Sequence, residues 1–168
     1  LRIQCGDEAT VGMYDGDLLV GSASSCEIDL AVPAAPSLAQ ARAATGRFPH
    51  SYDHVFDTCF VCGPGRPDHD GLGLFPRPVT DWDLLACPWV PAKDMLDDSG
   101  HVRKEILWSA LDCPGYFAAA GERLLHAVLG ELEGEILQPV EAEDLVVFSW
   151  PLGEKGRKLY AGTAIARQ

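Results

Sequence analysis

Four side chains that could take part in acid–base or hydrogen-bonding chemistry recur at helical spacing in the middle of the chain. Glu105, Ser109, Asp112 and Tyr116 are four, three and four residues apart, so a helix would place them along one stripe. A carboxylate on an otherwise apolar helix costs free energy unless it is paired or used. The stripe therefore predicts either a site in which a carboxylate acts as general base, or a set of structural ion pairs.

The helix that must carry this stripe is expected within residues 101–120. From Glu105 to Ala120 the sequence is apolar around most of a helical circumference, which is typical of a helix wrapped by other elements. Pro114 lies inside this stretch and has no amide hydrogen to donate to the carbonyl of Ala110. We therefore expect a kink near the middle of the helix.

Segments typical of β-strands lie on both sides of this helix. Short strand-like runs are found at 72–75 and 84–90, and three longer ones follow the helix at 125–137, 145–152 and 159–166. Consecutive strands joined by short turns pair antiparallel. One apolar helix with an antiparallel meander predicts an α+β fold in which the sheet wraps around the helix.

The beginning of the chain is expected to form an accessory extension that carries no chemistry. Asp15-Gly16 between two strand-like runs predicts a β-hairpin, and the alternation over 26–32 predicts a half-buried strand. Ser37 fits the N-cap position of a short helix over 38–45. We therefore divide the chain into a β and short-helix extension, residues 1–50, and a main domain, residues 51–168.

Composition and charge exclude several classes of protein. The chain has 168 residues, of which 47% are hydrophobic, and a formal net charge of −12. Nucleic acid is not an expected partner, because binding to phosphates favours a basic surface. We expect neither a signal peptide nor a membrane span, because no apolar run reaches about 18 residues. The six cysteines lack the dense spacing of a disulfide scaffold, which favours reduced thiols and a cytoplasmic location.

Several segments of the chain resemble the hotdog-fold thioesterase superfamily, and within it the PaaI-like thioesterases. Residues 103–120 resemble the central helix of that fold, residues 130–153 (GELEGEILQPVEAEDLVVFSWPLG) its strand–turn–strand segment, and KLYAGTAIA its closing strand. Residues 59–79, which begin with Cys-x-x-Cys-Gly, are similar to the opening of actinobacterial members. The resemblance covers roughly residues 53–168 and implies an antiparallel sheet wrapped around a long central helix.

The resemblance also implies an activity and an assembly. Such proteins pair their sheets across a homodimer, and they hydrolyse acyl-CoA thioesters at the dimer interface without a metal or another cofactor. Asp112 stands at the place of the family's helix aspartate, which implies a general base, with Glu105 and Ser109 as further catalytic candidates. The amides at the helix start would then stabilise the oxyanion that develops on the thioester carbonyl.

The start of the helix departs from the family pattern. Where the family has His-Gly-Gly, this chain has Arg103, Lys104 and Glu105. These side chains either obstruct the pocket or let Arg103 and Lys104 bind the phosphates of CoA, and Trp108 and Tyr116 are the remaining substrate-binding candidates. Two functions therefore stay open: a thioesterase, or a non-catalytic hotdog protein that binds acyl-CoA or another hydrophobic ligand, or serves as a dimeric scaffold. A hydratase would need an Asp/His pair in a longer loop, a motif that we do not find.

The Cys59-x-x-Cys62 pair offers a second kind of chemistry. A zinc site needs four ligands, and His54 and His69 are the residues that can complete one. A single pair is more often a structural turn with small buried thiols, so we expect no metal here. Cys113 is expected to be a core residue rather than a nucleophile, because no histidine adjoins it in the sequence.

Overall fold

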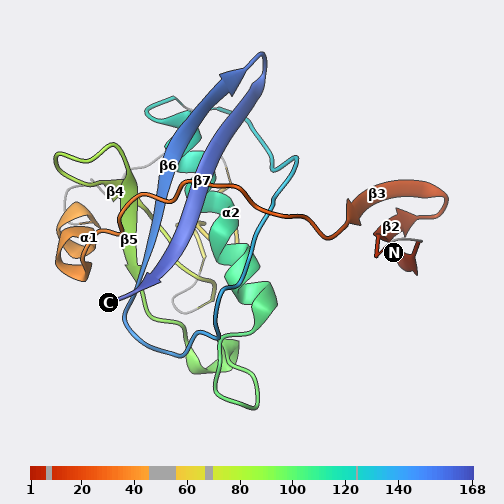
Figure 1. Cartoon of the computed structure of the whole chain (residues 1–168), viewed down its shortest axis with the longest axis horizontal. Coiled ribbons are helices and arrows are strands. Elements are labelled where there is room, and N and C mark those ends of the chain that lie inside the picture. Colours follow the sequence, from red (N-terminus) through yellow and green to blue (C-terminus); the bar gives the residue numbers. More distant parts are fainter. Residues whose placement is uncertain (7–8, 46–55, 67–69, 124) are drawn as a thin grey trace.

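The computed structural model describes residues 1–6, 9–45, 56–66, 70–123 and 125–168, which form an α+β arrangement with two antiparallel sheets and few helices (Figure 1). The first sheet, in the order β1-β2-β3, consists of β1 (Arg2–Cys5), β2 (Val11–Asp15) and β3 (Leu18–Ala23). The second, in the order β4-β5-β6-β7, consists of β4 (Arg77–Pro78), β5 (Leu85–Trp89), β6 (Leu145–Lys155) and β7 (Lys158–Arg167). The helices are α1 (Leu38–Thr45), α2 (Lys104–Ala120) and the 3₁₀-helix η1 (Lys93–Met95).

The four-stranded sheet is covered on both faces, because a helix packs against each one. Successive side chains of β6 alternate between the faces. Leu145 and Val147 belong to the apolar cluster that contains the buried side of α2, whereas Val146, Phe148 and Trp150 belong to the cluster that contains α1. All residues from 145 to 150 are buried. A strand covered on both sides has a continuous apolar sequence, and the start of β6 has one.

Helix α2 lies at the position predicted for the stripe and has 17 residues. The helix continues through Pro114 without a break and ends at Ala120, where it is followed by the C-cap residue Gly121 with a φ of 59°. No helix among the described residues is both long and apolar enough to cross a membrane. The buried side chains recur every three or four residues along the helix and are those of Ile106, Leu107, Ala110, Pro114, Phe117, Ala118 and Ala120.

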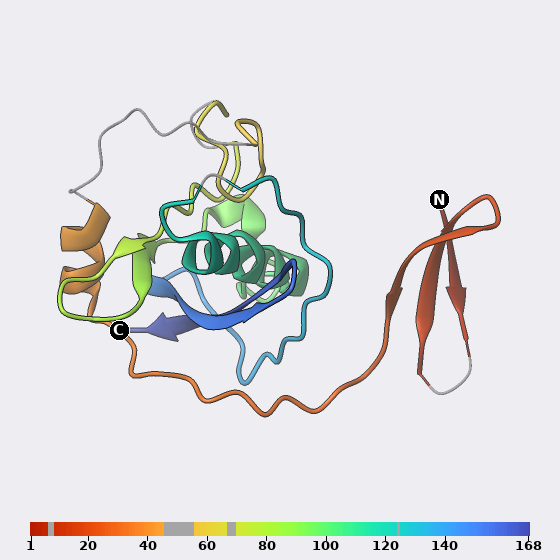
Figure 2. The same ribbon diagram turned by 90° about the horizontal axis from the view of Figure 1, so that it is seen from above.

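Most of the predicted antiparallel strands are confirmed. Residues 84–90, 145–152 and 159–166 correspond to β5, β6 and β7, and each neighbouring pair is antiparallel. The predicted N-terminal hairpin is formed by β2 and β3, with Gly16 in the turn at a φ of 58°. Figure 2 shows the first sheet standing apart from the rest of the chain, at the end of the extended residues 24–37.

The short helix predicted over 38–45 is also confirmed, as α1. Ser37 Oγ accepts a hydrogen bond from the amide of Gln40 (3.3 Å), and the amide of Ser37 donates to Gln40 Oε1 (2.9 Å). This reciprocal pair is a capping box, which satisfies amides that the first helical turn leaves free. Ala41 and Ala44 of α1 are buried against the second sheet. The division of the chain at residue 50 stays a prediction.

The strand predicted over 125–137 is wrong. These residues are extended, but they pair with no strand of the described chain and pass along α2 instead (Figure 2). Tyr116 Oη donates a hydrogen bond to the carbonyl oxygen of Leu125 (2.7 Å). A Cβ at Gly134 would come within 2.9 Å of the Trp108 ring. The alternation in the sequence therefore reflects the packing of this segment against α2, and not its pairing with a strand.

Two other predicted strands are wrong for related reasons. Residues 26–32 are extended and partly alternate in burial, but no strand among the described residues pairs with them. In the segment 72–75, the amides of Leu72 and Leu74 donate to the carbonyl oxygens of Phe60 and Val61, both at 2.8 Å. These bonds join the segment to the cysteine loop (residues 56–66) rather than to the sheet.

Candidate active site on helix α2

The two carboxylates of the predicted stripe lie in different environments. Asp112 is half-buried on α2, and burial raises the pKa of its carboxyl above the usual value. Glu105 lies in the first turn of the helix, where its side chain is 68% exposed and its Oε1 atom is 3.4 Å from Nε of Arg103. Only Asp112 therefore has the partly desolvated position that suits a general base.

The two hydroxyl groups of the stripe are both bonded to the backbone. Ser109 Oγ donates to the carbonyl oxygen of Glu105 at 2.7 Å, one turn earlier in the helix. Tyr116 Oη donates to the carbonyl oxygen of Leu125 at 2.7 Å. Each hydroxyl oxygen can still accept a hydrogen bond, but its hydrogen is already donated to a backbone carbonyl oxygen. The stripe is therefore a row of separate groups, with Asp112 as its one desolvated charge.

The start of α2 presents the second element of the predicted site. The amide of Arg103, the N-cap residue, donates to the carbonyl oxygen of Met95 at 3.0 Å, and the amide of Ile106 donates to the Arg103 carbonyl oxygen at 3.0 Å. The backbone bonds of the described residues give the amides of Lys104 and Glu105 no acceptor. Such amides at a helix start are suited to hold an oxyanion.

These two elements are separated along the helix axis. Asp112 follows Glu105 by seven positions, which corresponds to about 10 Å along the axis at the rise of an α-helix. A thioester in contact with both elements must either extend along α2 or take the carboxylate and the amides from two different chains. Experiment must therefore decide whether the carboxylate and the amides of one site belong to the same chain or to two chains.

The predicted substrate-binding residues surround the helix start and its exposed side. Arg103 and Lys104 are exposed, and Arg103 is held beside Glu105 by their ion pair. The Trp108 side chain is 37% exposed and covers Gly134, while the Tyr116 hydroxyl group fixes the start of the segment 125–137. The structure thus places Trp108 and Tyr116 against this segment, which forms a wall along α2.

A thiol cluster, formed by Cys59, Cys62 and Cys113, lies beside this row of residues. The Sγ atoms of Cys59 and Cys113 are 3.5 Å apart, and the three Sγ atoms all lie within 4.8 Å of one another. His54 and His69, the predicted partners of the Cys59/Cys62 pair, lie outside the described residues. No local pattern predicts the approach of Cys113, because it depends on the tertiary contact between the cysteine loop and α2.

The thiols of the core have raised pKa values. Burial raises the pKa of Cys87 to about 12. A hydrogen bond with Cys62, together with burial, raises the pKa of Cys113 far above the usual value. A cysteine nucleophile needs a lowered pKa, so neither thiol has the electrostatics of one.

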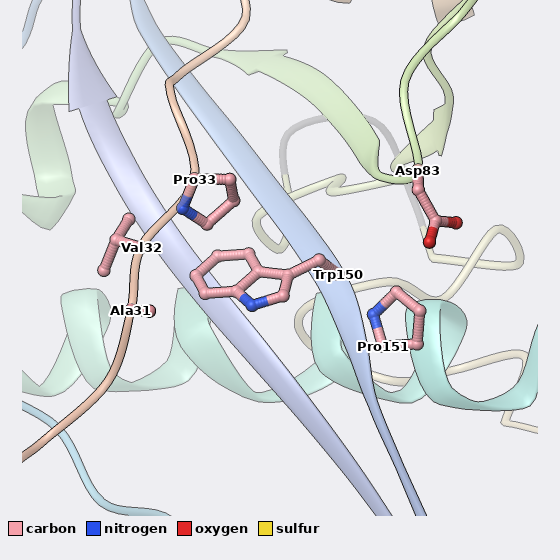
Figure 3. Close-up of a pocket in the computed structure, with 6 residues that line it drawn as sticks. All are labelled: Ala31, Val32, Pro33, Asp83, Trp150 and Pro151. Carbon is pink, nitrogen blue, oxygen red and sulfur yellow. The ribbon is translucent and has the colours of Figure 1, made fainter.

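One shallow depression of about 330 Å³ lies on the other face of the second sheet from α2, where residues 31–33 pass over the strands beside Trp150 (Figure 3). Figure 3 shows the Trp150 ring extending from β6 toward Val32 and Pro33, with Pro151 and the carboxylate of Asp83 on its other side. The sheet separates this depression from Asp112, because Trp150 belongs to the apolar cluster of the α1 face. It is therefore not the predicted acyl-CoA site.

No family model matches the chain, and no curated protein matches it. Among solved structures, the chain is similar to a crystal structure from Ralstonia eutropha described as a candidate thioesterase, a phenylacetic acid degradation-related protein. The two are 21% identical, the match covers 56% of this chain and 86% of that one, and the TM-score is 0.42. At this TM-score the likeness carries no argument about function. The α+β arrangement is compatible with the hotdog fold.

Proposed function

We propose that this chain is a hotdog-fold, acyl-CoA thioesterase-like protein that acts as a homodimer. The observation that carries the proposal is Asp112, a half-buried carboxylate with a raised pKa on α2, at the position where the resembling thioesterases have their catalytic aspartate. The packing of α2 against β6 and β7 supports the hotdog arrangement, with residues 1–50 as an extension. The substrate class follows from the sequence resemblance.

In the proposed reaction, Asp112 accepts a proton from a water molecule as the water oxygen attacks the thioester carbonyl carbon. The amides of Lys104 and Glu105 stabilise the negative charge on the carbonyl oxygen. The C–S bond then breaks, and the proton passes from Asp112 to the departing sulfur, which leaves a carboxylic acid and a free CoA thiol. Glu105 and Ser109 serve as accessory groups that orient the attacking water.

The proposed dimer uses the free edge of the second sheet. Strand β7 ends the order β4-β5-β6-β7, so one of its sides has no strand partner in the described chain. An unpaired edge offers backbone donors and acceptors to a second copy, and pairing there gives one continuous sheet. We propose that the carboxylate of one chain and the helix-start amides of the other meet at this interface, which removes the need for a substrate to span about 10 Å along one helix.

Arg103 and Lys104 would bind the phosphates of CoA. Both are exposed at the start of α2, where the free amides and the helix dipole also favour negative charge. Trp108, which is 37% exposed, and Tyr116, which is half-buried, would line the path of the acyl or pantetheine chain. The location that fits this assignment best is a cytoplasmic one, because acyl-CoA is an intracellular metabolite.

A non-catalytic acyl-CoA-binding or scaffold protein is the second candidate. The family's two glycines are replaced here by Lys104 and Glu105, which favours this second candidate because their side chains, with Glu105 paired to Arg103, occupy the helix start. Thermal shift with CoA and a panel of acyl-CoAs, followed by a thiol-release assay on the same panel, separates the two functions. Turnover supports the thioesterase, and stabilisation without turnover supports the binding protein. The absence of both stabilisation and turnover would contradict the thioesterase and the acyl-CoA-binding protein, and would leave the scaffold.

A further inference from the structure

The thiol cluster joins two parts of the chain that are far apart in sequence. Cys59 and Cys62 belong to the cysteine loop, whereas Cys113 lies 54 residues beyond Cys59 in the middle of α2. We propose that these three cysteines bind a thiophilic divalent cation, zinc, as thiolates, and that the ion fastens the cysteine loop to the helix. No step of the proposed hydrolysis uses this ion, so the two proposals stand independently.

The distances fit a metal site better than a disulfide. Zinc–thiolate bonds of about 2.3 Å in tetrahedral geometry place neighbouring sulfurs about 3.8 Å apart. The Sγ atoms of Cys59 and Cys113 are 3.5 Å apart, and each of the three pairs lies within 4.8 Å. A disulfide requires about 2.05 Å between two sulfurs and leaves the third thiol unused. Small adjustments of side chains bring all three sulfurs to one tetrahedral ion.

The loop that carries two of the ligands is held in place by its backbone. The amide of Gly63 donates to the carbonyl oxygen of Cys59 at 2.8 Å, which closes the turn around the Cys-x-x-Cys pair. A Cβ at Gly63 would lie 2.4 Å from the backbone oxygen of Asp57, so this turn requires glycine. The bonds from the amides of Leu72 and Leu74 hold the other side of the loop. The two sulfurs are therefore positioned before any ion binds.

A fourth ligand would have to come from outside the three cysteines. Cys62 is only 2% exposed, whereas Cys59 and Cys113 are half-buried and therefore partly accessible. Three protein ligands with one exchangeable position is an arrangement that zinc adopts in proteins. Small buried thiols alone would account for Cys62, but they give no reason for three sulfurs to converge from a loop and a helix.

The test is the zinc content of the full chain, purified without chelators and measured by inductively coupled plasma mass spectrometry. We expect about one zinc per chain, and near zero in each of Cys59→Ser, Cys62→Ser and Cys113→Ser. Two matched controls each remove a thiol outside the cluster, Cys26→Ser from an exposed position and Cys87→Ala from a buried one. Both should keep about one zinc per chain. Loss of zinc in the first two variants, with retention in Cys113→Ser, would overturn the assignment of the helix cysteine.

A second measurement needs no substitution in the cluster. The unmodified chain, reconstituted with Co²⁺, should show sulfur-to-cobalt charge transfer and the visible bands of a tetrahedral ion. Alkylation followed by peptide mapping should show protection of Cys59, Cys62 and Cys113 in the zinc-loaded chain, and their modification after a chelator is added. A metal-free chain that binds no Co²⁺, or a disulfide between any two of the three cysteines, overturns the proposal.

Discussion

The separation of Asp112 from the free amides of α2 leads to a prediction about two chains. Lys104 is the first residue of the helix, where proline is well tolerated, and Arg103 before it has the extended backbone (ψ of 142°) that a following proline favours. Lys104→Pro should therefore remove one oxyanion-binding amide while the helix still forms. We expect kcat to fall by about 10²–10³-fold. Lys104→Ala is the matched control, which keeps the amide and removes the charge, and it should mainly raise KM for acyl-CoA.

Mixing two inactive variants then shows which chain supplies each group. Asp112→Asn and Lys104→Pro chains are co-expressed with different tags, so that about half of the dimers contain one chain of each kind. If the carboxylate and the amide come from different chains, each mixed dimer has one intact site and one doubly altered site. The whole mixture should then show about a quarter of the unaltered activity, whereas the isolated mixed dimer should show about half.

The assay is thiol release from acyl-CoA by each homodimer and by the tag-purified mixed dimer. Mixed dimers with no more activity than the two homodimers would refute the two-chain site, because a site built within one chain is damaged in every chain of the mixture. Full activity in homodimeric Lys104→Pro would refute the role of that amide. Size-exclusion chromatography of the mixed species checks that a dimer has formed.

Two further predictions concern stability. Ser37→Ala removes the cap of α1, whose buried alanines pack on the second sheet, and should lower the free energy of unfolding in urea by about 1 kcal/mol. No loss relative to Ser25→Ala, an exposed control outside any helix, would contradict the capping role. Gly162→Ala places a Cβ 2.3 Å from the buried Trp150 ring and should cost about 1–3 kcal/mol. Gly130→Ala, which meets nothing within 4 Å, is its control and should stay within about 0.5 kcal/mol, so equal losses in the two variants would contradict the close packing.

The regular elements of the second sheet and α2 could be predicted because local sequence determines much of them. The apolar run around Asp112 has the composition of a buried helix, and Leu145 to Trp150 has that of a strand covered on both faces. Ser37 identifies the start of α1, because its side chain accepts a hydrogen bond from an amide of the first turn. In each case the residues that carry the pattern also make the contacts.

The errors arose where the backbone partner lies far away in sequence. The burial alternates over 131–137, where Ile136 packs against the core while the neighbouring glutamates are exposed, but the segment covers α2 instead of joining the sheet. A pattern of side chains shows which way they face, and not which backbone bonds form. The same limit applies to Cys113, whose approach to Cys59 depends on how the loop packs on the helix.

The most direct test of the central claim is the thioesterase activity of Asp112→Asn. Asparagine keeps the size of the side chain but cannot accept the proton of the attacking water, so turnover of the best acyl-CoA of the panel should fall by at least about 100-fold. Asp98→Asn, an exposed aspartate outside α2, is the control and should retain full activity. The thermal midpoint of Asp112→Asn should match that of the unaltered chain. Undiminished turnover in Asp112→Asn would contradict the account.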